Sequence, residues 1–127
     1  MTIMQLEGYQ KVRSKMEKKL INISKYYFRI FENKNLDKLE KLFTKDNILI
    51  DWENKIIGRK KVLNFCRNLF EKNEIKIKVI KIYTLKNRYT TSCQIEIKLN
   101  KKIYLRVVDI IHFNKNYKIK KIEAYKG

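Results

Sequence analysis

Residues 25–70 read KYYFRIFENKNLDKLEKLFTKDNILIDWENKIIGRKKVLNFCRNLF, and this stretch decides the fold. It opens with an aromatic run on helical spacing. A short helix is expected over residues 36–43, because Asn35 can cap its first turn. Residues 47–52 have the β-branched and alternating character of a strand. Residues 59–72 place apolar side chains at i, i+3, i+4 and i+7, so they predict a third helix.

The flanking segments complete an α+β pattern. Apolar residues recur every three or four positions over residues 6–30, which predicts one long N-terminal helix. After a connection at residues 55–58 and the third helix, the chain alternates like strands to its end. These strands cover residues 75–82, 93–99, 103–113 and 117–125, with a bulge near Val79 and hairpin turns at 86–88 and 100–102. The order predicts helices gathered over one face of a curved antiparallel sheet.

The composition limits the class of protein. The chain has 127 residues, 44% of them hydrophobic, which is enough for one core. We find no secretory signal and no membrane-spanning run, so we expect a cytoplasmic protein. Cys66 and Cys93 are then free thiols in a reducing compartment. Two cysteines and one histidine make a poor zinc site, so no metal is expected.

The formal net charge is +18. One interpretation is binding to nucleic acid or to another anionic surface. The other is biased composition, since lysine far outnumbers arginine and lysines are spread along every expected element. Phosphate-binding surfaces favour arginine interleaved with exposed aromatic rings. We therefore expect neither nucleic acid nor a membrane as the partner.

Asp109 is the residue that most needs a chemical explanation. On residues 103–113 it shares a face with Leu105, Val107, Ile111 and Phe113, the face that must form the core. A lone ionised carboxylate there is costly, so it must be hydrogen-bonded, open to a cavity or protonated. A purely structural aspartate and a functional one fit this position equally well.

Two further candidates have alternative interpretations of their own. Asp51 ends the first expected strand, where an aspartate is also common as a turn starter. Tyr27 lies in the aromatic helix, where simple core packing would explain it as well.

The aromatic helix, the run NLDKLEKLFTKDNILID and the glycine before the third helix resemble the nuclear transport factor 2-like superfamily. SnoaL-like polyketide cyclases and ketosteroid isomerases belong to it. The resemblance covers residues 23–125. It implies a cone-shaped, cystatin-like α+β roll with about three N-terminal helices. Residues 1–22 would be a helical extension, and residues 23–127 the SnoaL-like domain.

The resemblance to ketosteroid isomerase implies roles for the three candidates. Asp51 would be the base that moves a proton at carbon. Tyr27 and a protonated Asp109 would donate hydrogen bonds to the dienolate oxygen, as a tyrosine and a neutral carboxylic acid do in ketosteroid isomerase. No cofactor is implied. The expected ligand contacts are Phe31, Trp52, Phe65, Phe113, Ile122 and Ala124. Trp52 is bulkier than the residue usual in the isomerases.

Two functions remain open. The first is a small-molecule role, in which the cone binds an apolar ligand with or without isomerase or cyclase chemistry. The second is a non-catalytic interaction module. The outer sheet face carries Tyr104, Arg106, Val108, Ile110 and His112, a mixture that suits a homodimer or another protein partner.

Overall fold

The structure is a computed structural model that describes residues 3–85 and 88–127. Its elements, in chain order, are α1 (Ile3–Glu32), α2 (Leu36–Leu42), β1 (Phe43–Ile50), β2 (Lys55–Ile57), α3 (Arg59–Lys72), β3 (Ile75–Thr84), β4 (Thr90–Leu99), β5 (Ile103–Phe113) and β6 (Ile119–Lys126). The expected α+β class is confirmed. The third helix and the strand that carries Asp109 have the predicted bounds.

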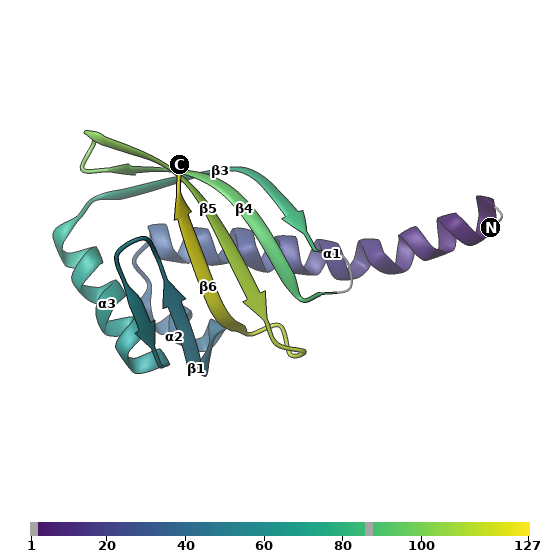
Figure 1. The fold of residues 1–127 in the computed structure, drawn as a ribbon, viewed down its shortest axis with the longest axis horizontal. Coiled ribbons are helices and arrows are strands. Elements are labelled where there is room, and N and C mark those ends of the chain that lie inside the picture. Colours follow the sequence, from purple (N-terminus) through teal and green to yellow (C-terminus); the bar gives the residue numbers. More distant parts are fainter. Residues whose placement is uncertain (1–2, 86–87) are drawn as a thin grey trace.

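The strands of the described chain form one curved sheet in the order β2-β1-β6-β5-β4-β3. Figure 1 shows α1 running along the concave side of this sheet, with α2 and α3 beside β1. The sheet is mixed rather than wholly antiparallel, because β1 and β6 pair in parallel. Strands that are joined by a short turn must pair antiparallel, but two strands as far apart in the chain as β1 and β6 can pair in either direction. The pattern of short turns therefore did not predict the parallel pair.

Helix α1 is one continuous helix, so the expected boundary between residues 22 and 23 lies inside it. Its N-terminal part extends beyond the sheet in Figure 1. The predicted cap of the next helix is confirmed, since the Asn35 side chain accepts a hydrogen bond from the Lys38 amide at 3.1 Å. Lys34 precedes this cap with a φ of 59° and turns the chain between the two helices.

The end of β1 differs from the expected strand. The strand stops at Ile50, and Oδ1 of Asp51 accepts the amides of Glu53 at 2.8 Å and Asn54 at 2.6 Å. These bonds close a tight turn that folds Lys55–Ile57 back onto β1 as β2, a strand that we had expected to be a connection. Local side-chain bonds of aspartate compete with extended structure in this way.

The inner face of β5 forms the core as predicted. Val107, Ile111 and Phe113 are at most 4% exposed. The expected bulge in β3 is confirmed between Val79 and Lys81. The predicted turn at residues 86–88 falls partly outside the described residues, as do residues 1–2 of the expected extension.

Both cysteines are free and buried, as expected. Across residues 3–85 and 88–127, we find no helix with both the length and the apolar character needed to cross a membrane.

Candidate functional site

A cavity of about 170 Å³ lies between the concave side of the sheet and helices α1 and α3. Its wall is almost wholly apolar and consists of Phe28, Phe31, Leu49, Trp52, Phe65, Leu69, Ile75, Ile77, Ile95, Ile97, Leu99, Leu105, Val107, Ile122 and Ala124. The polar side chains that line it are Tyr27, Asp51, Cys66 and Asp109. An apolar hollow with a few converging polar groups is the usual form of a small-molecule site.

Tyr27 reaches the cavity from α1. Its ring packs against Phe28, Phe31 and Phe43, with centroids 5.1, 5.8 and 6.2 Å away, and the residue is 3% exposed. Burial, reinforced by the charge of Asp109, raises the pKa of Tyr27 well above its ordinary value. Its hydroxyl has no hydrogen-bond partner among the described residues. Tyr27 is therefore a buried O–H donor that stays protonated.

Asp109 enters the cavity from β5, between Cys93 of β4 and Ala124 of β6. It is 8% exposed, and burial raises the pKa of its carboxyl from 3.8 to about 7. Within the described part of the chain its carboxyl also lacks a hydrogen-bond partner. Below about pH 7 the group is a neutral acid that can donate a hydrogen bond into the cavity.

Asp51 has two structural relationships at once. It lines the cavity, and its Oδ1 holds the β1–β2 turn through two backbone amides. The side-chain amide of Asn54 adds a contact of 3.2 Å to Oδ1 and one of 3.4 Å to Oδ2. The turn-starter interpretation is therefore correct. Oδ2 has only the single long contact to the Asn54 side chain.

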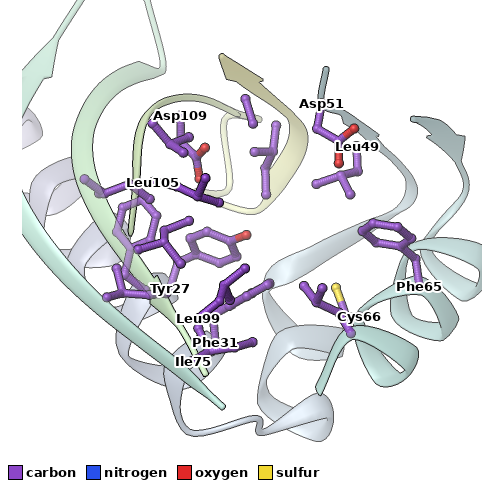
Figure 2. Close-up of a pocket in the computed structure, with 18 of the residues that line it drawn as sticks. Tyr27, Phe31, Leu49, Asp51, Phe65, Cys66, Ile75, Leu99, Leu105 and Asp109 are labelled. Atoms are coloured by element: carbon purple, nitrogen blue, oxygen red, sulfur yellow. The ribbon is translucent and has the colours of Figure 1, made fainter. Parts of the chain in front are cut away.

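The three candidates come from helix α1, the turn after β1 and strand β5, and they line one cavity, as Figure 2 shows. The Tyr27 hydroxyl points toward the middle of the hollow. Asp109 and Asp51 approach it from the sheet side. The fold thus brings Asp109 to the same space as two residues that precede it by 58 and 82 positions.

Five of the six expected ligand contacts also line this cavity, namely Phe31, Trp52, Phe65, Ile122 and Ala124. Phe113 does not. It shares the inner face of β5 with Asp109, but four residues along a strand separate them by roughly 13 Å. Phe113 instead packs in the core, and its amide bonds to the Tyr89 carbonyl at 2.7 Å.

The turn explains why adjacent residues can both line the cavity. Within a continuous strand over residues 47–52, Asp51 and Trp52 would lie on opposite faces. Both instead lie beyond the end of β1, where alternation no longer applies.

Cys66 also lines the cavity, although the sequence had not suggested it as a site residue. It lies on the apolar face of α3, next to Phe65, and its position could have been found from that helical face. Burial raises the pKa of its thiol to about 12, so the group stays an S–H. Leu105 and Val107 could likewise have been found, because they precede Asp109 on one face of β5.

The high charge does not extend into the cavity. No lysine, arginine or histidine of the described residues lines it. His112, on the other face of β5, bonds to Glu123 at 2.8 Å. The cationic surface and the apolar cavity are separate features of the molecule.

A family model of the nuclear transport factor 2 (NTF2) domain matches residues 22–119. The chain belongs to this family. A search of curated proteins found no match.

Three solved structures illustrate the range of proteins with this fold. The epoxide hydrolase/cyclase-like enzyme SalBIII, with a role in pyran ring formation in salinomycin, is 16% identical, with a TM-score of 0.76 and coverage of 87% of this chain and 92% of that one. A candidate ketosteroid isomerase from Kribbella flavida is 12% identical, with a TM-score of 0.76 and coverage of 87% and 79%. A protein of unknown function with a cystatin-like fold from Methylobium petroleophilum is 11% identical, with a TM-score of 0.75 and coverage of 85% and 75%.

These likenesses establish the fold of this NTF2 domain and nothing finer. The same architecture is shared by enzymes of the ketosteroid isomerase and SnoaL type. Because one fold hosts many activities, the function must be argued from the cavity itself.

Proposed function

We propose that the protein binds a small, neutral, mostly apolar ligand in this cavity and holds one acceptor oxygen of that ligand with Tyr27 and Asp109. The observation that carries the proposal is the pair of buried hydrogen-bond donors without partners among the described residues, in an otherwise apolar hollow. Because both side chains line the cavity, a ligand oxygen between them would accept two hydrogen bonds. Each such bond contributes about 0.5–1.5 kcal/mol net.

The charges near the cavity favour a neutral ligand. A carboxylate ligand would lose its hydration without meeting a cationic side chain, since no lysine, arginine or histidine of the described chain lines the wall. A carbonyl oxygen suits both donors. The ligand class is thus a small ketone, enone or enol.

Catalysis would add two proton transfers to this binding. In a cyclic β,γ-enone, Asp51 would remove a proton from the carbon between the carbonyl and the double bond. The electrons of that C–H bond would pass into a dienolate whose oxygen accepts bonds from Tyr27 and neutral Asp109. Asp51 would then return the proton to the γ-carbon, and the product is the conjugated enone. No atom is gained or lost, and no redox partner is required.

Thermal unfolding with cyclohexanone tests the binding proposal. A ligand at about ten times its Kd stabilises a protein by roughly 1.4 kcal/mol, which should raise Tm by about 3–6 °C for a chain of this size. Tyr27→Phe should weaken binding about 3- to 10-fold through loss of one hydrogen bond. Tyr104→Phe is the matched control, because Tyr104 is 70% exposed and lies outside the cavity. Equal affinities of the two variants would refute the proposal.

The pH dependence of binding tests the part assigned to Asp109. Its ionised form cannot donate a hydrogen bond, and its pKa is raised to about 7 by burial. Affinity should therefore fall as pH rises through 7. The Asp109→Asn variant keeps an N–H donor and should bind with an affinity that does not change between pH 6 and 8. A wild-type affinity that is equally flat would contradict this role.

The second candidate function is pairing of two copies through the outer sheet face. Its support is a group of large side chains exposed on that face, namely Ile80, Tyr83, Tyr104 and Tyr125. Lysines and Arg106 lie among them, so two copies would repel at low salt. Light scattering after size exclusion should then find a dimer that strengthens with salt. A monomer at every salt concentration would exclude this function.

A further inference from the structure

The size of the cavity limits the ligand that the proposed function can use. Its volume is about 170 Å³. An apolar protein cavity of roughly 150 Å³ holds a benzene molecule, whereas pockets for drug-sized ligands begin at about 300 Å³. The space thus matches one six-membered ring with a small substituent, and is too small for a fused polycyclic ketone.

The exposure of the lining residues identifies the open end. The two donors, Tyr27 and Asp109, and their neighbour Ile122 are at most 8% exposed, so this end of the cavity is closed. Trp52 is 44% exposed and lines the same cavity. Trp52 is the most exposed of the described lining residues, so its indole lies where the cavity meets solvent.

The backbone that carries Trp52 is held firmly. The Asp51 amide donates to the Asn54 carbonyl at 2.9 Å, and Oδ1 of Asp51 accepts the amides of both Glu53 and Asn54. Lys126 belongs to β6, the strand that pairs with β1 on the side away from β2. Its ammonium group lies 5.8 Å from the centre of the Trp52 indole ring. The hydrogen bonds fix the backbone of the turn, and the indole of Trp52 forms part of the cavity wall.

We infer that the cavity takes a neutral carbonyl compound of a single ring and that Trp52 sets this size limit. The inference rests on the proposed function, because it assumes that the two donors hold the carbonyl oxygen. It adds a specificity-determining residue and a narrower ligand class. Trp52 does not touch the reacting oxygen. It limits how far a ligand can extend away from that oxygen.

A ketone series of increasing size tests the inference in the full chain. The probes are cyclohexanone, the fused two-ring ketone 2-decalone and a four-ring steroid ketone, each titrated calorimetrically and by thermal unfolding. The wild type should bind cyclohexanone at least 10-fold more tightly than 2-decalone. Trp52→Ala should admit the second ring and bind 2-decalone more tightly than cyclohexanone. The ratio of the two affinities in Trp52→Phe should lie between the ratios of the wild type and Trp52→Ala. Tyr104→Ala controls for the loss of an exposed aromatic ring.

The outcomes separate the two proposals. A wild type that binds the steroid ketone as tightly as cyclohexanone overturns the inference, and so does an unchanged preference in Trp52→Ala. The position of Trp52 in an exposed turn makes folding of both variants expected, and a circular dichroism spectrum verifies it. If Tyr27→Phe binds cyclohexanone like the wild type, the proposed function fails, whereas the size order still reports on Trp52 by itself.

Discussion

Replacing Asp109 by Asn should change how the stability of the protein depends on pH. Burial raises the pKa of this carboxyl from 3.8 to about 7, so the folded state binds its proton more tightly than the unfolded state does. Between these two pH values the unfolded chain is ionised while the folded chain is protonated. Folding stability must then fall as pH rises from about 4 to 7, and remain constant above that range.

The structure gives the size of this effect. The difference between 3.8 and about 7, at about 1.4 kcal/mol for each pH unit, amounts to on the order of 4 kcal/mol. By pH 5 the loss should be roughly 1.6 kcal/mol. This is a large share of the total free energy of unfolding of a typical domain, which is about 5–15 kcal/mol. Asn has nearly the same shape and does not ionise, so the variant lacks this contribution.

Urea unfolding of the two proteins at pH 5, 6, 7 and 8 measures the effect. We expect the free energy of unfolding of Asp109→Asn minus that of the wild type to rise by about 2–3 kcal/mol from pH 5 to pH 8. Other titrating groups cancel in this difference. The exposed Asp46, changed to Asn, is the control and should give a flat difference. A flat difference for Asp109→Asn as well would show that its carboxyl is not desolvated, and the neutral-donor argument would fail.

Three further predictions concern the other polar groups. Asp51→Asn should keep the free energy of unfolding within about 0.5 kcal/mol of the wild type, since Asn also closes such turns. It should slow isomerisation of 3-cyclohexenone, followed by the absorbance of the conjugated product, by about 10²- to 10⁴-fold. Asp51→Ala should lose both stability and activity, and full turnover by Asp51→Asn would exclude Asp51 as the base. Cys66 and Cys93, with pKa values raised by burial to about 12 and about 11, should react with iodoacetamide at pH 8 only after urea unfolding; mass spectrometry reads this out, and rapid labelling of the folded protein would contradict it. Asn35→Ala should lower the free energy of unfolding by about 1 kcal/mol through loss of the α2 cap, as measured by urea unfolding. Its affinity for cyclohexanone should equal that of the wild type.

Much of the fold could be predicted because it is encoded over short distances. The helix Arg59–Lys72 and the strand Ile103–Phe113 have periodic apolar patterns, and both were predicted residue for residue. Asn35 caps its helix through a bond to a residue three positions away. The inward direction of Asp109 follows from strand alternation. Interactions of this kind are local, so the order of residues is enough to infer them.

Other features depend on which segments meet. The parallel pairing of β1 with β6 and the short strand β2 follow from contacts that no local pattern records. The turn at Asp51 ended a strand that alternation alone would have continued, and it brought Trp52 into the same wall.

The periodic pattern of residues is enough to predict an apolar core with the acidic side chain of Asp109 turned into it. The folded chain is needed to see that Tyr27, Asp51 and Asp109 share one cavity of about 170 Å³ and that Phe113 lies outside it. Periodicity gives the direction of a side chain but not its distance from other side chains. A cavity arises where a curved sheet and its helices fail to fill the space between them, and that space exists only once the whole chain has packed.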